Sequence, residues 1–561
     1  MPDRAAIDTL FPADLPEPEH WERQYPPRQL PEGAQVTRFG PSPTGFVHIG
    51  GVYVATIDRD IATHSGGVYL MRLEDTDQSR EVEGALTQFA RAFDYFDLRP
   101  DESNDGAEHG AEHGAEHGAY GPYHQLARER IYLTYVRHLL RQGKAYLCFA
   151  TKDDLADITA RQQAAKIPTG YYGNWAIWRD ADPAAVAAKL AEDAPYVVRF
   201  HAPDAAAGQR VRFTDAIRGE LEHEANRNDT VILKSSDQSP RLPTYHFAHA
   251  VDDHLMRVTL VIRGEEWISS VPLHQQLFDA LGFEPVTYAH IAPLMKQIPG
   301  GKRKLSKRKD PEASVDYYIE AGYPANAVLY YLRGLANGRL AELPLDKALA
   351  TPIRLDQCGV AGPLVDLVKL EDISADHIAT LTSQQVYDAV RTWATQHDPD
   401  LATVLDAEPA LALRALAVER EGVDNPRKDL RKWSDFRPAY GFFFPQLLTP
   451  LSGPADERLA LLGVDSGVAA TFARDFVDGY QHLGDPQEWF SQIRELAAKH
   501  GFAPNAKEYK KNPDAYPGSI REASQLVRVV LTGSTRSPDL HAITQAIGAD
   551  EVLRRLRALA D

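Results

Sequence analysis

The chain contains very little cysteine: Cys148 and Cys358 are its only two, and they stand far apart in 561 residues. A disulfide framework is therefore not expected, and a reducing cytoplasm is the simplest location. No apolar run approaches the ~20 residues that a membrane-spanning helix needs. The N-terminus carries no charged and then apolar secretion signal. We expect a cytoplasmic protein with no membrane partner.

The chain also lacks positive charge overall, with a formal net charge of −18. Taken alone, this balance argues against a general nucleic-acid binder, which is usually basic. Affinity for phosphates depends on local patches, however, and acidic residues elsewhere can suppress wrong sites. The basic residues do gather locally, at residues 302–304, 307–309 and 427–432. A protein that binds RNA through restricted patches remains possible.

The length predicts several domains, about three or four. Residues 1–34 are rich in Pro, Asp and Glu, and we interpret them as a mobile arm or short extension. Residues 35–39 form a strand-like run, 52–62 a helical pattern and 67–73 a second strand. This order of strand, tight turn, helix and strand is typical of the opening of a nucleotide-binding α/β unit.

Later segments extend this α/β pattern and then leave it. Strands are expected at 196–200 and 260–262, and an exact tandem Gly-Ala-Glu-His repeat at 106–119 predicts a solvated loop insertion. From about residue 315 helical patterning dominates, which predicts an all-helical appendage to an α/β core. The expected helices are 124–142, 152–165, 270–281, 327–335, 383–393, 411–421, 487–500 and 551–559.

A first motif occupies residues 38–51, at the predicted turn from strand to helix. Its Gly and Pro residues exclude a helix through 40–45, and its glycines let a nucleotide approach the backbone. Free N–H groups at such a helix N-terminus favour anions. His48 can donate a hydrogen bond to a phosphate without adding a permanent charge. A Gly/Pro-rich turn with a surface histidine is the alternative.

A second motif is Lys304-Leu305-Ser306-Lys307-Arg308, which follows Gly300 and Gly301. Two lysines on a mobile, glycine-hinged loop can reach a leaving pyrophosphate, where negative charge grows during phosphoryl-type transfer. A solvated basic run is the alternative. Together, the two motifs indicate nucleotide chemistry.

At these residues the chain resembles a known family. The motifs are similar to the HIGH-type and KMSKS-type signatures of class I aminoacyl-tRNA synthetases. Residues 72–77, 121–125, 243–248, 251–254, 261–267 and 526–533 resemble segments of the bacterial glutamate–tRNA ligases. Gly51 stands where the class signature ends in histidine, a variant common among glutamyl enzymes.

The resemblance implies a fold and a domain order. It implies an α/β, Rossmann-like catalytic domain with an inserted connective domain, a helical stem-contact region and an all-α anticodon-binding domain. The expected boundaries are 1–34 for the extension, 35–120 and 240–310 for the catalytic domain, 121–239 for the acceptor-binding insertion, 311–385 for the stem-contact region and 386–561 for the anticodon-binding domain.

The resemblance also implies roles for residues. Glu74 would bind the α-ammonium group of glutamate, and two guanidinium groups would bind its carboxylates, with geometry that suits a bidentate pair. His48, Lys304 and Lys307 would be catalytic. The full glutamate set is Arg38, Ser42, Glu74, Tyr245 and Arg263, and the ATP set is His48, Gly50, Glu266, Lys304, Ser306 and Lys307. His249 stands where many members of the family have asparagine.

ATP, Mg²⁺, L-glutamate and tRNA(Glu) are the implied substrates, cofactor and partner, with tRNA(Gln) as a possible second acceptor. Activation that depends on bound tRNA is also implied, and we expect a monomer. No zinc is expected, because Cys148-Phe149-Ala150 replaces the Cys-x-Cys pair of some members. Contact with tRNA is expected at Arg427, Lys428, Arg431, Lys432 and Trp433, with a solvated helix face as the alternative.

Two other functions compete with glutamate–tRNA ligase. A glutamine–tRNA ligase usually has a β-rich anticodon region, whereas this tail is predicted to be helical, and Arg263 suits a carboxylate better than an amide. A non-catalytic tRNA-binding relative is disfavoured because Lys304, Ser306 and Lys307 are intact.

Overall fold

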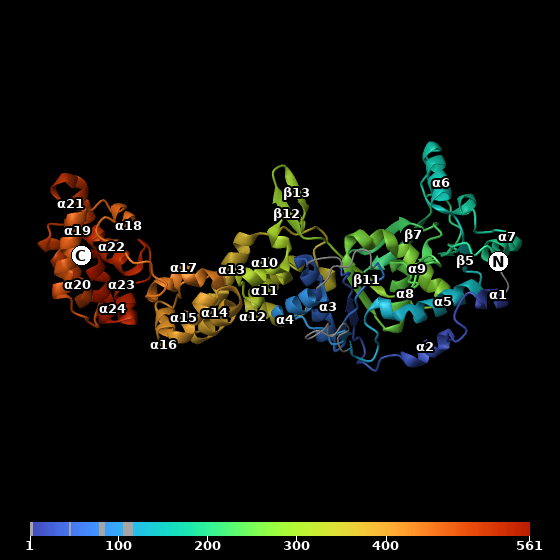
Figure 1. Ribbon diagram of the computed structural model, residues 1–561, viewed down its shortest axis with the longest axis horizontal. Coiled ribbons are helices and arrows are strands. Elements are labelled where there is room, and N and C mark those ends of the chain that lie inside the picture. The colour runs from blue at the N-terminus through green and yellow to red at the C-terminus, as the bar shows by residue number, and fades with distance from the viewer. Residues whose placement is uncertain (1–3, 44–46, 78–84, 105–115, 561) are drawn as a thin grey trace. The chain divides into compact units, whose positions relative to one another are not determined.

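The structure is a computed structural model, and it describes residues 4–43, 47–77, 85–104 and 116–560. The chain divides into two compact units (Figure 1). Unit 1 comprises Met1–Tyr317 and Leu329–Asp366, and unit 2 comprises Tyr318–Val328 and Leu367–Asp561. No helix in the described residues is both long and apolar enough to cross a membrane.

A six-stranded sheet organises unit 1, with strand order β2-β1-β10-β11-β7-β8. The first five strands run parallel, and β8 returns antiparallel to β7. A parallel sheet with helical crossovers is the predicted nucleotide-binding architecture. The strands are β1 (Val36–Phe39), β2 (Val68–Met71), β7 (Arg210–Asp215), β8 (Gly219–Glu224), β10 (Leu260–Gly264) and β11 (Thr287–Ile291).

The register of this sheet brings polar residues to neighbouring positions. Arg38 on β1 lies beside Leu70 on β2, and Arg263 on β10 lies beside His290 on β11. Tyr288 on β11 pairs with Asp215, the last residue of β7. Because parallel strands end at the same edge, this edge carries several charged side chains close together.

The helices of the sheet begin and end at identifiable residues. α3 (Ile49–Ser65) starts three residues before the predicted 52–62, because the His48 side chain caps its first turn. It ends at Gly66, whose φ of 69° is favourable for glycine. The other helices packed in this part are α4 (Ala85–Tyr95), α8 (Tyr245–Leu255) and α9 (Val271–Leu281).

The insertion of unit 1 builds a separate three-stranded antiparallel sheet, in the order β5-β6-β9. Thr151 and Asp154 form a capping box that starts its α6. The β7–β8 hairpin lies in the same stretch of sequence but joins the large sheet. The elements are α5 (Glu129–Arg141), β5 (Ala145–Cys148), α6 (Lys152–Ala164), α7 (Pro183–Ala191), β6 (Val197–Phe200) and β9 (Val231–Leu233).

The N-terminal segment differs from the mobile arm that its composition suggested. It forms α1 (Arg4–Asp8) and α2 (Pro18–Gln24), which pack against α5. Arg141 of α5 binds both Asp8 and Glu17. The interpretation as a mobile arm was wrong, because a few apolar side chains spaced along the segment enter the main core. These are Ile7, Phe11, Leu15 and Tyr25.

Two short antiparallel ribbons complete unit 1. β3 (Ser103–Asn104) pairs with β4 (Glu116–His117) near the end of the tandem repeat, and residues 105–115, which include most of that repeat, lie outside the described residues. β12 (Met295–Ile298) pairs with β13 (Gly301–Lys304), which carries the start of the second motif.

Helices alone follow: after Lys304 the described residues contain no strand, as predicted. Unit 2 has two apolar cores, one around Val386, Leu416 and Phe443 and one around Phe472, Leu526 and Leu556. The helices from residue 315 onward are α10 (Val315–Ala321), α11 (Ala325–Ala336), α12 (Leu345–Ala350), α13 (Leu367–Thr380), α14 (Ser383–His397), α15 (Pro399–Ala407), α16 (Pro409–Ala417), α17 (Phe436–Tyr440), α18 (Glu457–Ala460), α19 (Ser466–Gly479), α20 (Pro486–Lys499), α21 (Ala506–Lys511), α22 (Ile520–Thr532), α23 (Leu540–Ile547) and α24 (Ala549–Ala560).

The helix predicted at 411–421 ends early, at Ala417. Val418 is no longer helical, and Glu419 has a positive φ of 53°. The apolar period continues past the end of the helix, so periodicity alone missed the turn. The basic stretch that begins at Arg427 is consequently irregular rather than a helix face.

Asp58 on α3 gives a stability prediction. Its carboxylate is fully buried, neither oxygen has a partner among the described residues, and burial raises its pKa well above the usual range. The folded state therefore holds a proton that the unfolded chain loses above about pH 4, so stability falls as pH rises from there. We expect Asp58→Asn to raise the stability of the protein at pH 8 by about 1–3 kcal/mol.

Calorimetric melting at pH 5 and pH 8 measures this effect. The gain should be larger at pH 8, because the wild-type penalty grows with pH. Asp237→Asn, at an exposed position of the same unit, is the control and should change neither melting temperature. A variant that melts below wild type at pH 8 would contradict the prediction.

Candidate active site

The two sequence motifs meet in unit 1. The imidazole of His48 accepts a hydrogen bond from the Gly50 N–H through Nδ1, at 2.8 Å, and hydrogen bonds with the carbonyl of Leu305. Burial, aided by the charges of Lys307 and Lys304, lowers the pKa of His48 to about 4. His48 is therefore neutral near pH 7, and a ring with Nδ1 as acceptor carries its proton on Nε2. The Nε2–H, which faces the Leu305 carbonyl, is thus a neutral donor at the point where the two motifs meet.

Asp310 organises the loop that carries the second motif. It accepts a forked pair of hydrogen bonds from Arg303, at 2.6 and 2.7 Å, and one from the Ser306 N–H at 2.9 Å. Hydrogen bonds from Arg303 are the largest cause that lowers its pKa. The hairpin turns at Gly300, whose φ of 86° suits glycine. Gly300 and Gly301 thus form the turn of the β12–β13 hairpin, and Asp310 fixes the strand that follows it.

Lys304 and Glu266 form an ion pair at the rim of the site. The Lys304 Nζ lies 3.0 Å from Glu266 Oε1, and both side chains are more than half exposed. Lys307 is more enclosed, and burial lowers the pKa of its ammonium group. The structure thus places three predicted ATP residues, Glu266, Lys304 and Lys307, around the same two elements, η4 (Glu265–Ser270) and β13 with its following turn.

The placement of Glu266 depends on Gly264, and this gives a second prediction. A Cβ at Gly264 would lie 2.2 Å from Glu266 Oε2. Gly264→Ala should therefore push the carboxylate out of place and raise the KM for ATP by about 10- to 100-fold, the cost of a misplaced group. Steady-state kinetics with varied ATP measures this. Gly338→Ala is the matched control, because nothing lies within 4 Å of a Cβ there. An unchanged KM for ATP in Gly264→Ala would count against the role of Glu266.

A buried network of charges lies on the other side of the site. The guanidinium of Arg38 lies 3.5 Å from Glu74 and 3.5 Å from Asp253. Arg72 approaches Asp253 at 2.5 Å and Glu74 at 3.4 Å. All four side chains are less than a tenth exposed. Two cations thus face two carboxylates. A bound ammonium group can pair with one of the carboxylates, and a bound carboxylate can pair with one of the guanidinium groups.

Asp252 and Asp253 belong to this network, and the sequence analysis gave neither of them a role. Asp252 accepts hydrogen bonds from Arg128, Gln125 and Tyr132, all in the stretch that follows the repeat. The available signal was their position on a helix next to two apolar strands, where two adjacent aspartates on a buried face need partners.

His249, which stands where many members of the family have asparagine, lies inside this network. It is fully buried, its Nδ1 lies 2.7 Å from Asp253 Oδ2, and its Nε2 lies 2.8 Å from the Tyr288 hydroxyl. Burial lowers its pKa to about 4. Both ring nitrogens are used within the protein, so His249 bridges Asp253 and Tyr288.

Arg263 lies on β10, the strand next to β1, and its side chain is 5% exposed. Its Nε donates to His290 Nε2 at 3.1 Å, and Nη2 lies 3.3 Å from His274 Nδ1. Its guanidinium carbon lies 4.6 Å from the centre of the Tyr288 ring. Its Nη1 is buried and has no hydrogen-bond partner among the described residues. A buried cationic donor without a partner is costly, which indicates a place for an anionic ligand.

Tyr245 joins the predicted glutamate residues. Its ring lies 4.5 Å from Trp267. Burial raises its pKa, Glu74 raises it further, and Arg38 and Arg263 lower it. The Tyr245 ring also lies 5.9 Å from that of His249, which contacts Asp253 beside Arg38, and 6.2 Å from that of His274, which contacts Arg263. Four of the five residues predicted to bind glutamate thus belong to one cluster. Ser42, the fifth, is exposed on the turn before residues 44–46, which are not described.

The basic stretch at 427–433 is largely paired within unit 2. Trp433 is 8% exposed and belongs to a core. Arg427 also lines a cavity of about 300 Å³ with Arg437, Arg458 and Arg536. The ion pairs are Arg427 with Glu419 and Asp429, Lys428 with Asp376, Arg431 with Glu371 and Asp435, and Lys432 with Glu371.

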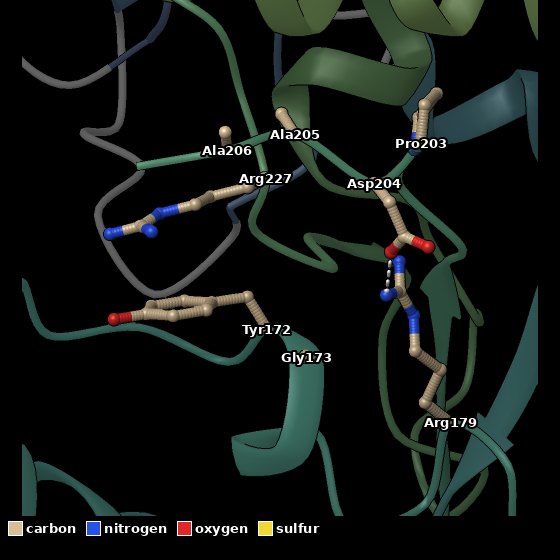
Figure 2. Close-up of a pocket in the computed structure, with 8 residues that line it drawn as sticks. All are labelled: Tyr172, Gly173, Arg179, Pro203, Asp204, Ala205, Ala206 and Arg227. Atoms are coloured by element: carbon tan, nitrogen blue, oxygen red, sulfur yellow. Dashed lines mark hydrogen bonds and ion pairs between the residues drawn. The ribbon is translucent and has the colours of Figure 1, made fainter. Parts of the chain in front are cut away.

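Cys148 is buried in the insertion, where its Sγ lies 3.4 Å from the Tyr171 hydroxyl and accepts from Arg199 at 3.3 Å. Tyr172 and Arg227 line a cavity of about 320 Å³, and Figure 2 shows the Arg227 guanidinium over the Tyr172 ring. Among the described residues, no three metal-ligating side chains form a group that could hold a metal ion.

Comparison with known proteins identifies relatives along the whole chain. A family model described as tRNA synthetases class I (E and Q), catalytic domain, matches residues 35–344, and an anticodon binding domain model matches 519–560. The glutamate–tRNA ligase of Sorangium cellulosum is 39% identical, covering 96% of this chain and 97% of that protein. That of Clostridium beijerinckii is 40% identical, covering 96% of each.

A solved structure is similar as well. It is a glutamate tRNA ligase from Elizabethkingia meningosepticum in complex with its amino acid, at a TM-score of 0.73 and 26% identity. The match covers 93% of this chain and 98% of that one.

Proposed function

The chain belongs to the family of class I tRNA synthetases for glutamate and glutamine, and from this premise we propose that it is a glutamate–tRNA ligase that joins L-glutamate to tRNA(Glu). The α-carboxylate of glutamate attacks the α-phosphorus of ATP and displaces pyrophosphate. The terminal ribose hydroxyl of tRNA then attacks the glutamyl-adenylate and releases AMP. No enzyme nucleophile is needed, so the protein acts by positioning and by charge.

The observation that carries this proposal is the buried Nη1 of Arg263, which has no hydrogen-bond partner among the residues that the structure describes. A side-chain carboxylate would satisfy it, whereas a neutral amide would leave the cation short of charge. The C-terminal helices support the same choice. A glutamine–tRNA ligase usually has a β-rich anticodon region, whereas the described residues after Lys304 contain no strand. The relatives at 39–40% identity are glutamate–tRNA ligases.

The remaining glutamate contacts follow from charge. Glu74 accepts the α-ammonium group, and Arg38 binds a carboxylate. Burial raises the pKa of Glu74, while Arg38 and Arg72 oppose that shift. A bound ammonium group would add a further cation beside Glu74 and favour its ionised form. Ser42 is proposed as a fifth contact from the turn above the site.

ATP binds where the two motifs meet. His48 and Gly50 lie at the N-terminus of α3, where the positive end of the helix dipole favours phosphate. Lys304 and Lys307 neutralise charge on the departing pyrophosphate, and Ser306 and Glu266 complete the site. Mg²⁺ is expected to accompany the ATP phosphates and to reduce their charge.

We propose that unit 2 binds the tRNA anticodon, with the arginine-lined cavity as its contact rather than the whole stretch 427–433. Arg536 is exposed on this cavity, and Arg427 joins it to the predicted stretch. The rest of the predicted stretch then serves mainly to hold Arg427 and its side of the cavity in place. These residues are Lys428, Arg431, Lys432 and Trp433. Unstacked loop bases are read by stacking and by edge hydrogen bonds, which arginine supplies.

A substitution in this cavity gives a third prediction. Arg536→Ala should raise the KM for tRNA by about 5- to 30-fold, the cost of one charged contact, with an unchanged KM for ATP. Aminoacylation kinetics with varied tRNA measures it. Arg557→Ala, on α24 and outside the cavity lining, is the control. Equal tRNA kinetics in both variants would remove the cavity from the tRNA interface.

The decisive test is charging of purified glutamate and glutamine tRNAs with labelled glutamate or glutamine, ATP and Mg²⁺. Transfer of glutamate to the glutamate tRNA is expected, and the second tRNA shows whether the enzyme discriminates. Transfer of glutamine alone would overturn the proposal in favour of glutamine–tRNA ligase. A folded protein that binds tRNA but transfers neither would be a non-catalytic relative. Sedimentation of the active enzyme tests the expected monomer.

A further inference from the structure

Three neighbouring strands deliver a buried chain of side chains to Arg263. Arg263 ends the buried run of β10, His290 lies beside it on β11, and Asp215 ends β7. Asp215 Oδ2 lies 2.6 Å from His290 Nδ1, and His290 Nε2 accepts from Arg263 Nε at 3.1 Å. The three residues are 1%, 0% and 5% exposed. None of the motifs in the sequence includes Asp215 or His290.

The protonation of this chain is fixed by its neighbours. Burial disfavours ionisation of Asp215, but hydrogen bonds from His290 and from the N–H groups of Arg218 and Ile217 outweigh it, and its pKa is lowered. Burial lowers the pKa of His290. The Asp215 carboxylate accepts a hydrogen bond from Nδ1–H of the neutral imidazole. The proton therefore stays on Nδ1, and the Nε2 lone pair is available to accept from Arg263.

The backbone anchors the carboxylate firmly. Asp215 Oδ1 accepts from the N–H groups of Ile217 at 3.0 Å and Arg218 at 2.9 Å. Its Oδ2 accepts from the His290 N–H at 3.0 Å as well as from the ring. The Arg218 side chain in turn donates to the His290 carbonyl at 3.0 Å. The link between Asp215 and His290 is therefore held by two contacts, and the carboxylate is anchored by two further backbone N–H groups.

We propose that Asp215 and His290 are positioning residues that orient the Arg263 guanidinium toward the side-chain carboxylate of the substrate. The Nε edge of Arg263 is tied to His290, and the face of Tyr288 lies below its plane. This leaves Nη1, without a partner among the described residues, as the fixed donor. The inference rests on the proposed function, since it assigns a purpose to the orientation of the glutamate-binding arginine.

Orientation matters because guanidinium recognition is directional. A carboxylate accepts along the planar N–H directions, and a rotated guanidinium offers charge without that geometry. Loss of the Nε2 acceptor would leave the guanidinium held only through Nη2, by His274 and the Trp267 carbonyl, and by the Tyr288 ring, so that its Nη1 could turn away from the substrate. Binding of glutamate would then carry the entropic cost of ordering the guanidinium group. This cost weakens the binding of glutamate more than it slows the chemical step.

Variants of the two residues test this role. Asp215→Asn removes the charge that fixes the tautomer, His290→Leu removes the acceptor, and His290→Gln keeps an acceptor oxygen. We expect the KM for glutamate to rise by about 10- to 100-fold in Asp215→Asn and His290→Leu, and by less in His290→Gln. The kcat should stay within about 5-fold, and the KM values for ATP and tRNA should stay unchanged.

Matched controls separate positioning from a purely structural role. Asp475→Asn disrupts a His–Asp pair of unit 2, in which Asp475 lies 2.9 Å from His500, and should leave the KM for glutamate unchanged. Circular dichroism and melting confirm that each variant folds. A uniform fall in kcat, with all three KM values unchanged and no rescue by His290→Gln, overturns the inference.

Arg263→Leu distinguishes the two levels of the argument. If it raises the KM for glutamate but neither Asp215→Asn nor His290→Leu does, the positioning role is wrong and the proposed pocket stands. If Arg263→Leu itself leaves glutamate binding unchanged, the pocket is wrong, and the inference fails with it.

Discussion

Arg263→Leu is expected to lower kcat/KM for glutamate by about 10²- to 10³-fold, because a buried carboxylate would lose its cationic partner at a cost of about 3–5 kcal/mol. The loss should appear mainly in the KM for glutamate. Arg263 is 5% exposed, so water cannot replace the guanidinium. The kcat/KM for glutamine should fall much less, because its neutral amide gains little from the charge of Arg263. The ratio of kcat/KM for glutamate to that for glutamine should therefore become smaller.

Aminoacylation with varied glutamate and glutamine, at saturating ATP and tRNA, measures this result. Arg212→Leu is the matched control: Arg212 lies on β7 of the same sheet, with an exposed side chain. It should leave both amino acids unaffected. An Arg263→Leu enzyme that keeps the wild-type preference for glutamate would show that another group reads the side chain.

Lys304→Ala is expected to lower kcat by about 10²- to 10³-fold, with little change in the KM for glutamate. Removal of one charge aimed at the departing pyrophosphate costs roughly 3–4 kcal/mol of transition-state stabilisation. The fold should be spared. The Lys304–Glu266 pair is more than half exposed, and such pairs contribute at most about 1 kcal/mol to stability.

Pyrophosphate exchange in the presence of tRNA isolates the activation step. Lys302→Ala on the same strand is the control, since Lys302 is exposed and contacts only the Gly362 carbonyl among the described residues. Wild-type exchange in a folded Lys304→Ala protein would remove the second motif from catalysis. It would also favour a non-catalytic role for the chain.

The two signatures show which structural features are determined by short stretches of sequence. Gly300 and Gly301 mark a turn, and His48 marks the start of a helix, because these preferences act within a few residues. The strands and helices of the α/β part followed the period of their apolar residues for the same reason. The family resemblance then supplied candidates that spacing alone could not, and Arg38, Glu74, Tyr245 and Arg263 do converge.

The errors share a cause. The N-terminal segment is poor in apolar residues, so its composition indicated a mobile arm, yet Tyr25 is 1% exposed in a core built from distant elements. The period of residues 411–421 predicted a helix beyond Ala417, where Glu419 turns the chain with a positive φ. In both places long-range packing or a single backbone angle overrode the local pattern.

The sequence by itself determined the class of the protein: its chemistry is carried by short motifs whose residue types suit ATP and a carboxylate substrate. Only the tertiary structure decided how those motifs are held. Asp253 beside Arg38, and Asp215 behind His290, are pairings between residues far apart in the chain. Strand order sets such pairings, since β7, β11 and β10 become neighbours only in the folded sheet. Local preferences carry no information about which distant carboxylate will meet a buried cation, and burial makes that meeting necessary.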